Sequence, residues 1–194
     1  SGLLEPQSGN IYINGMDVSK RENKKNILRI LGYMGSQDGY FPRLQVMEYL
    51  EVYAHAQGLY GLAARERCME VLQLGHLERR AEQLVEEQSA SVRRELSFLR
   101  AILHRPRLLL LDDPFNGMES AQKLAMEELF AILAEDEVTV LMASQSLPDA
   151  AHLCGEIGII EKGRIISEGN LSDILRQARS EALLYLRVCE APEA

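Results

Sequence analysis

Short apolar runs alternate with stretches of helical periodicity along most of the chain. Four runs have the length and composition of buried strands, and they lie at residues 27–34, 108–111, 138–143 and 157–160. Residues 121–134 and 147–153, which separate the later runs, carry apolar side chains at helical spacing. Because strands that alternate with helices pack as a parallel sheet covered by helices, this pattern predicts an α/β domain with a parallel sheet.

The longest helical pattern covers residues 46–103 and is interrupted near residues 58–61 and at Gly75-His76. It lies between two predicted strands, so we expect a helical insert in the sheet. Closer to the N-terminus, residues 11–13 alternate and lead into the turn dipeptide Asn14-Gly15, which predicts a hairpin or edge element.

The two ends of the chain carry weaker patterns. The opening residues are expected to form the tail of a helix that ends near Pro6, so that the chain starts inside a domain. Residues 183–188 are expected to form one further strand before a polar tail.

Composition and charge narrow the class of protein. The 194 residues fit one domain, and 46% hydrophobic with 26% charged residues is typical of a folded protein. The net charge of -8 argues against a nucleic-acid-binding surface, which needs clustered Lys and Arg. Cys68, Cys154 and Cys189 have neither disulfide-framework nor zinc-site spacing, which favours a reducing, cytoplasmic setting. No apolar run approaches the roughly 20 residues of a membrane-spanning helix, so we expect any membrane association to be peripheral.

Polar residues follow two of the predicted strands. Asp112-Asp113-Pro114 ends the run at residues 108–111, and a polar loop at residues 35–39 ends the run at residues 27–34. Because ligands of open α/β sheets bind at the carboxyl ends of the strands, both segments are candidate sites.

A succession of segments resembles the ATP-binding domain of ABC transporters, in particular the exporter type that pairs with a separate membrane permease. The most specific segment runs from Arg93 to Glu119 and is similar to the family's signature helix, Walker B strand and D-loop, in that order. Residues 32–50 resemble its Q-loop region, and residues 163–169 resemble its closing hairpin.

The resemblance implies a fold and an assembly. The fold is a P-loop NTPase-like (RecA-like) parallel sheet core with an α-helical insert subdomain at residues 46–105. Residues 1–194 would be a single, partial domain from which the N-terminal strand and the phosphate loop are missing. In the family, two such domains sandwich two ATP molecules with Mg²⁺, each nucleotide held by the phosphate loop of one domain and the signature motif of the other. The implied partners are a second ATP-binding domain, in a homo- or heterodimer, and a membrane permease at the cytoplasmic face of the membrane.

The phosphate loop GxxxxGK(S/T) occurs nowhere in the 194 residues. In that motif, backbone N–H groups, the Lys and the hydroxyl hold the phosphates and the magnesium ion. Either the chain is a fragment, which the expected start inside a helix favours, or the protein lacks the loop. In both cases we expect the chain as given to bind ATP and Mg²⁺ weakly or not at all.

The Walker B segment keeps one acidic residue and alters the other. Asp112 matches the Asp that holds magnesium through water, and it is the metal candidate. The family's next residue is a Glu that serves as the base for the attacking water, and Asp113 stands there, one methylene shorter. Because a base must lie within hydrogen-bond reach of the water, we expect Asp113 to be a slower catalytic base. The alternative is that Asp112-Asp113-Pro114 forms only a solvated turn at the end of a strand.

The signature motif, Leu-Ser-Gly-Gly-Gln or close to it in the family, is replaced by Gln88-Ser89-Ala90-Ser91-Val92. Ser89 matches, whereas Ala90 and Ser91 replace glycines that let backbone amides approach a phosphate closely. We expect these three residues at the partner domain's nucleotide, with a weakened contact. The alternative is that Ser89 only caps a helix.

Three further catalytic positions differ from the family. Gln145 stands at the switch His, and a neutral Gln would stabilise the transition state less than a cation. Glu119 stands at the D-loop Asp. At the Q-loop, the alignment puts Ser36 at the Gln position and Gln37 one place late, so the loop is shifted or the contact with magnesium and water is lost.

These changes fall on catalytic contacts while the hydrophobic framework is kept, which suggests relaxed constraint on hydrolysis. Two functions follow from this pattern. The first is a nucleotide-binding subunit of an ABC-type exporter that couples ATP binding and hydrolysis to transport and is hydrolysis-deficient as given. The second is a non-hydrolysing interaction subunit that docks a permease or a competent partner domain. The chain does not encode the transported substrate, because selectivity in the family lies in the permease.

Overall fold

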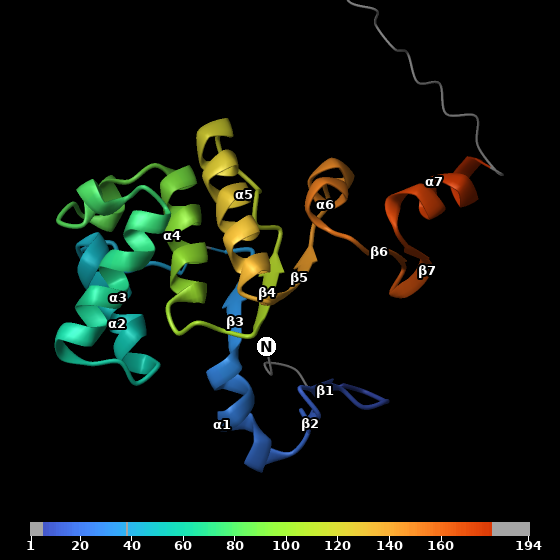
Figure 1. Ribbon diagram of the computed structural model, residues 1–194, viewed down its shortest axis with the longest axis horizontal. Helices are drawn as coiled ribbons and strands as arrows, with labels where there is room; N and C mark the ends of the chain where they lie inside the picture. Colours follow the sequence, from blue (N-terminus) through green and yellow to red (C-terminus); the bar gives the residue numbers. More distant parts are fainter. Residues whose placement is uncertain (1–5, 38, 180–194) are drawn as a thin grey trace, which may run out of the picture. The chain divides into compact units, whose positions relative to one another are not determined.

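The computed structural model of the chain describes residues 6–37 and 39–179 (Figure 1). These fall into two compact units, Ser1–Gln145 and Ser146–Ala194, and each is described by itself. The helix tail expected before Pro6 and the strand expected at residues 183–188 lie outside the described residues.

A three-stranded parallel sheet is the centre of the first unit. Strands β3 (Leu31–Met34), β4 (Leu108–Asp112) and β5 (Thr139–Ala143) pair in the order β3-β4-β5. The register places Met34 beside Leu111 and Asp112 beside Ala143, so the three strands run in the same direction and end at one edge. The predicted α/β class with a parallel sheet is confirmed.

The central strand β4 is buried more deeply on one face than on the other. Successive side chains of a strand point to opposite faces of the sheet. Leu109 and Leu111 are buried, whereas Leu108 and Leu110 are half-buried. The expectation that this strand is buried on both faces was therefore wrong for one face.

Strand β5 is more open than its sequence suggested. Its five residues are exposed or half-buried, and Leu141 is 65% exposed. Within the described residues β5 pairs only with β4, so its other edge carries no ladder of hydrogen bonds. The strand predicted at residues 138–143 is present, but the prediction that this strand is buried was wrong.

A helix that the sequence analysis did not predict precedes β3. Helix α1 (Arg21–Ile30) passes directly into β3 at Leu31, without an intervening turn. The apolar run at residues 27–34 is thus divided, and Ile27 is buried on the helix rather than on a strand. A helix end without Gly or Pro leaves no mark in the sequence, which explains why the single-strand prediction was wrong for the first half of the run.

The predicted N-terminal hairpin is present. Strands β1 (Tyr12–Ile13) and β2 (Met16–Asp17) pair in antiparallel orientation across Asn14-Gly15. Asn14 and Gly15 have φ angles of 49° and 72°, the left-handed conformation that a tight hairpin turn requires.

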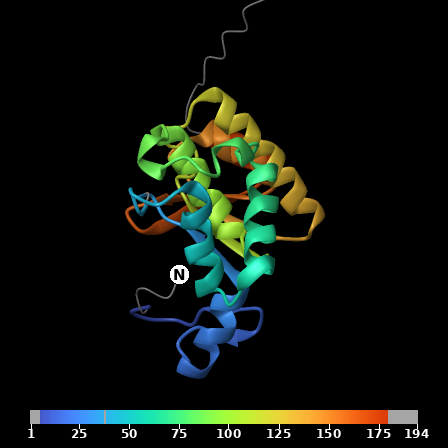
Figure 2. The same ribbon diagram turned by 90° about the vertical axis from the view of Figure 1, so that its left-hand side faces the viewer.

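Helices α2 (Val46–Ala56), α3 (Gly61–Leu74) and α4 (Ala90–Ile102) fill the predicted helical stretch. Two short 3₁₀ turns, η1 (Glu78–Arg80) and η2 (Val85–Glu87), connect α3 to α4. Figure 2 shows α2 and α3 in front of α4, and α4 in turn packs against β3 and against α5 (Ser120–Glu135). Helix α4 therefore lies between the outer helices and the sheet.

The second unit contains a helix, an antiparallel hairpin and a final helix. Its elements are α6 (Leu147–Leu153), β6 (Ile157–Glu161), β7 (Arg164–Gly169) and α7 (Leu171–Arg179). The closing hairpin expected at residues 163–169 is confirmed. Within the described residues β6 pairs only with β7, so the run at residues 157–160 is a strand but does not extend the parallel sheet.

We expect Gly32→Ala to destabilise the first unit. A Cβ at this position of β3 would overlap the carbonyl oxygen of Ala101 and lie 2.7 Å from Leu109 Cδ1. Overpacking of this kind lowers the free energy of unfolding by about 1–3 kcal/mol, which urea titration would measure. The matched control is Gly158→Ala in β6, where nothing lies within 4 Å. A Gly32→Ala protein as stable as the wild type would contradict the close packing of β3 on α4.

We also expect the amides of β5 and β6 to exchange with solvent faster than those of α4. Both strands have an edge that no described residue pairs, and amides on such an open edge exchange readily and can pair with another chain. Unless another segment fills these edges, the isolated chain should be aggregation-prone or partly molten. Hydrogen exchange on the purified monomer is the measurement, and strong protection of both strands would refute the argument.

Candidate functional site

The carboxyl edge of the parallel sheet brings together five of the residues that the sequence singled out. Ser36 and Gln37 follow β3, Asp112 and Asp113 end β4, and Gln145 follows β5 by two residues. The Ser and the two Gln residues are exposed, and the two Asp residues are half-buried. Because the strands are parallel and in register, all five lie at the same edge.

The backbone of Asp113 has an uncommon conformation. Its φ angle is 51°, a region that Asp enters more readily than most residues but that a residue before proline normally avoids. Its N–H donates to the carbonyl oxygen of Ala143 at 2.7 Å, which extends the ladder between β4 and β5 by one bond. A backbone of this kind persists only where surrounding contacts hold it in place.

Arg94 of α4 supplies such contacts. It is 3% exposed, and its hydrogen bonds include four to backbone carbonyl oxygens of the described residues. Nη2 bonds Asp112 at 2.7 Å and Asp113 at 2.8 Å, Nη1 bonds Gly35 at 2.7 Å, and Nε bonds Pro114 at 3.3 Å. One guanidinium thus ties the ends of β3 and β4 to α4. No role for Arg94 was predicted from the sequence, because a charged residue in a helix usually lies on its solvent-exposed face.

The N-terminus of α4 carries Ser89, Ala90 and Ser91, which were predicted to contact the nucleotide of a partner domain. Ser89 accepts a hydrogen bond from the N–H of Val92 at 3.2 Å, so its predicted role as a helix cap is confirmed. Ser89 and Ala90 are both exposed. Their contact with a partner's nucleotide stays a prediction.

Ser91 differs from its two neighbours because it is buried. Its hydroxyl accepts the N–H of Glu119 at 2.9 Å and donates to Oε1 of Gln122 at 3.2 Å. Glu119 is exposed and stands at the N-cap of α5. The structure therefore joins two of the predicted site residues, Ser91 and Glu119, in a second cluster at the start of α5.

The strand-end carboxylates fit a magnesium ion that arrives with a phosphate ligand. Among residues 6–37 and 39–179 there is no group of three or more His, Cys, Asp or Glu that could hold a metal ion without other ligands. Mg²⁺ commonly uses only one or two carboxylates together with substrate phosphates. Asp112 and Asp113 supply that number.

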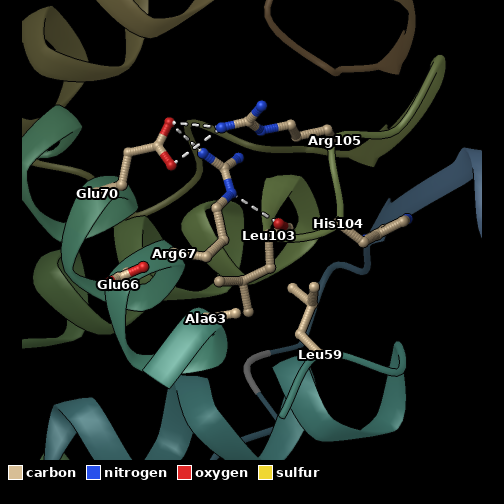
Figure 3. Close-up of a pocket in the computed structure, with 8 residues that line it drawn as sticks. All are labelled: Leu59, Ala63, Glu66, Arg67, Glu70, Leu103, His104 and Arg105. Carbon is tan, nitrogen blue, oxygen red and sulfur yellow. Dashed lines mark hydrogen bonds and ion pairs between the residues drawn. The ribbon is translucent and has the colours of Figure 1, made fainter. Parts of the chain in front are cut away.

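A cavity of about 420 Å³ lies elsewhere, between α3 and the segment that follows α4 (Figure 3). Three of its charged side chains are engaged with one another. Arg67 bonds Glu70 at 2.7 Å and the carbonyl oxygen of Leu103 at 2.8 Å, and Arg105 lies 3.2 Å from the same Glu70. None of the predicted site residues lines this cavity, so it is separate from the candidate site.

Glu95, the residue after Arg94, is a buried carboxyl group. It is 1% exposed, and its Oε1 has no hydrogen-bond partner. Burial raises the pKa of Glu95 to about 7, against an opposing effect of the Arg80 guanidinium. The folded chain therefore holds this proton at pH values where the unfolded chain has lost it.

We expect Glu95→Gln to remove a pH dependence of stability. Since the folded pKa is about 7 and the ordinary value is 4.5, the wild type is most stable below pH 4.5 with respect to this group and loses that stability as the pH rises towards 7. The full loss corresponds to about 3 kcal/mol. Urea titrations across this window should show the slope in the wild type and in the exposed control Glu82→Gln, but not in Glu95→Gln. Equal slopes in all three proteins would contradict a buried neutral carboxyl group.

Comparison with known proteins agrees with this geometry. The profile of the family described as "ABC transporter" matches residues 1–116. The linearmycin resistance ATP-binding protein LnrL of Bacillus subtilis (strain 168) is 29% identical over 100% of this chain and 62% of its own length. The bacitracin transport ATP-binding protein BcrA of Bacillus licheniformis is 33% identical over 86% of this chain and 53% of its own length. The chain thus spans between about half and two thirds of the length of these relatives.

Solved structures give the same result. One described as the ATP binding subunit of an ABC transporter is 27% identical, with a TM-score of 0.80 over 92% of this chain and 73% of that chain. The ATP-binding cassette MJ0796, in a dimeric post-hydrolysis state bound to ADP and Pi, is 23% identical with a TM-score of 0.77 over 88% of this chain and 76% of its own, and it supports the fold alone. A profile match over more than half of the sequence and a P-loop NTPase-like fold together establish that this chain belongs to the ABC transporter family and has the fold of its ATP-binding domain.

Proposed function

We propose that this chain acts within the nucleotide-binding subunit of an ABC-type exporter, where ATP binding by a pair of such domains moves an attached permease. The observation that carries the proposal is the strand-end edge, where Asp112 and Asp113 lie beside the end of β3 and are held there by Arg94. The names of the relatives, which refer to linearmycin resistance, bacitracin transport and Nod factor export, support export as the process. The exported substrate is not part of the proposal.

Each strand-end residue has a proposed role. Asp112 holds Mg²⁺, and Asp113 orients and deprotonates the attacking water. Ser36 or Gln37 contacts the ion or that water, and Gln145 donates a hydrogen bond to the terminal phosphate. Bound ATP with Mg²⁺ would supply the phosphoryl group that is transferred. Because the chain itself has no GxxxxGK(S/T) segment, it is expected to hold this ligand weakly or not at all.

Hydrolysis at this edge is proposed to be slow. Asp113 is one methylene shorter than the usual Glu, so its carboxylate reaches the water less well. Gln145 is neutral, so it stabilises the negative charge of the transition state less than a cation would. We therefore propose that the chain as given is deficient in ATP hydrolysis.

The second cluster is proposed to serve the nucleotide of a partner domain. Ser89 and Ala90 stand exposed at the N-terminus of α4, where the free N–H groups and the helix dipole favour a phosphate. The hydroxyl of Ser91 is already engaged by Glu119 and Gln122, so Ser91 contributes through its backbone. The backbone N–H of Glu119 is bonded to that hydroxyl, so Glu119 contributes through its exposed side chain. The partner is a second ATP-binding domain in a homo- or heterodimer.

The chain is proposed to be one partial ATP-binding domain, residues 1–194, with a helical subdomain at residues 46–105 that faces the permease. None of the helices described in residues 6–37 and 39–179 is both long and apolar enough to cross a membrane. Attachment through the permease at the cytoplasmic face would need no such helix. The net charge of -8 supports a protein partner rather than a nucleic acid.

A second candidate function is a non-hydrolysing subunit that docks a permease or a competent partner domain. The replacement of both signature glycines, by Ala90 and Ser91, favours it, because each added Cβ hinders close approach to a phosphate. The DNA upstream of the Ser1 codon separates the two functions. An in-frame GxxxxGK(S/T) supports the nucleotide-binding subunit, and an intact upstream region without it supports the docking subunit.

Titration with Mg-ATP tests the proposal directly. The chain as given should show no micromolar binding by calorimetry. Joining the strand and phosphate loop of the 27% identical ATP-binding subunit before Ser1 should restore micromolar binding while turnover stays about 10²-fold below that of the intact relative. In this restored protein Asp113→Glu should raise the turnover rate more than the affinity for ATP. Asp112→Asn should remove the increase in ATP affinity that Mg²⁺ gives.

Two outcomes would contradict the assignment of roles. Micromolar binding by the chain as given would mean that phosphates are held without the loop. Turnover of the restored protein equal to that of the intact relative would mean that Asp113 and Gln145 do not limit the chemical step.

A further inference from the structure

We propose that Arg94 is a positioning residue that makes the strand-end edge and the N-terminus of α4 move as one rigid piece. The inference rests on the proposed function and adds to it a physical link between the two clusters. The first cluster contains Asp112 and Asp113 at the strand ends. The second cluster contains Ser91 and Glu119, next to the exposed N-terminus of α4.

The bonding pattern of Arg94 is specific to a guanidinium. Five N–H groups in a planar fork let one side chain reach several acceptors in fixed directions. All three nitrogens of Arg94 are used, and three of the four acceptors are the consecutive carbonyl oxygens of Asp112, Asp113 and Pro114. The fourth acceptor, Gly35, comes from a different strand end.

Consecutive carbonyl oxygens can converge on one group only where the backbone turns sharply. The φ angle of 51° at Asp113 makes that turn, in a position before proline that disfavours it. Arg94 holds the turned backbone from one side, and the bond from the Asp113 N–H to Ala143 holds it from the other. The placement of both carboxylates, Asp112 and Asp113, therefore depends on Arg94.

Ser91 provides a second link, between the first turn of α4 and the start of α5. Ser91 lies three residues before Arg94, and residues at this spacing are neighbours on a helix surface. Arg94 bonds the backbone at residues 112–114, and Ser91 bonds Glu119 and Gln122 at the start of α5. A displacement of the α4 N-terminus is thus passed to the carboxylates through a continuous chain of hydrogen bonds, which is a physical basis for coupling.

The chain offers a matched control at the other end of α4. Arg67 of α3, which is half-buried, donates to the carbonyl oxygens of Leu103 at 2.8 Å and Ile102 at 2.9 Å (Figure 3). It is the same kind of bond between an arginine and the backbone, and it is remote from the strand ends. If Arg94 only stabilised the fold, substitution of either arginine would change amide exchange at the strand ends only through the loss of global stability.

The test compares Arg94→Met, Arg94→Lys and Arg67→Met in the chain itself, by urea unfolding and by native-state amide exchange. In Arg94→Met, the amides of Asp113, Asn116 and Met118, which are hydrogen-bonded in the wild type, should exchange at least about tenfold faster than the loss of global stability explains. Arg94→Lys keeps the charge but not the fork, so it should recover global stability more than it recovers protection of these amides. Arg67→Met should leave their excess exchange unchanged.

A kinetic readout separates positioning from folding. In the restored protein that carries a phosphate loop, Arg94→Lys should lower kcat for ATP by at least about tenfold with KM within about twofold, because misplaced catalytic groups affect the chemical step first. Arg67→Met should change neither constant.

Two results would overturn the inference. One is exchange at Asp113, Asn116 and Met118 that rises only with global stability, and the other is an equal effect of Arg67→Met. The exchange measurement needs no nucleotide, so it tests Arg94 independently of the proposed function. A local effect on exchange in the chain, together with no ATP binding or turnover in the restored protein, would keep the positioning role and reject the proposed function.

Discussion

Burial of α4 is the constraint on which the rest of the first unit depends. Ten of its 13 residues are buried, and they contact α3 on one side and β3 and α5 on the others. A helix buried all round normally carries apolar residues throughout, yet this one carries Arg94 and Glu95 in succession. Each polar group must be satisfied or neutralised where it lies. Arg94 is satisfied by backbone carbonyl oxygens at the strand ends, and Glu95 is favoured in its neutral form by a raised pKa.

The elements that sequence analysis predicted correctly are those whose signals are local. The hairpin at Asn14-Gly15, the helical stretch from residue 46 and the strand at residues 108–111 each have a pattern that neighbouring residues determine. The failures lie where distant contacts decide. Whether residues 138–143 are buried depends on what pairs with their outer edge. The run at residues 27–34 pairs with β4 from Leu31 onward, so where its strand begins depends on a partner far along the chain.

The same division applies to the candidate site. The position of Asp112 and Asp113 after an apolar run was enough to predict a strand-end site, because parallel strands end at one edge. The role of Arg94 was not predictable, since these acceptors belong to two strand ends, at Gly35 and at residues 112–114, that are far apart in the sequence and meet only in the fold. Ser91 illustrates the same limit. Its sequence position suggested only a lost glycine, whereas its bonds to Glu119 and Gln122 depend on where α5 begins.

The two replaced glycines of the signature motif have different physical consequences. Ala90 is exposed, so its Cβ adds bulk at the surface that would face a phosphate and adds nothing to the interior. Ser91 is buried, and its hydroxyl fills two hydrogen-bonding requirements inside the protein, of which the free N–H of Glu119 at the start of α5 is one. One substitution therefore weakens the proposed contact with nucleotide while the other strengthens the attachment of α4 to α5. The proposed link from α4 to the strand ends depends on the buried hydrogen bonds of Arg94 and Ser91 and not on the side chains proposed for hydrolysis. Coupling within the domain is thus physically separable from catalysis at its edge.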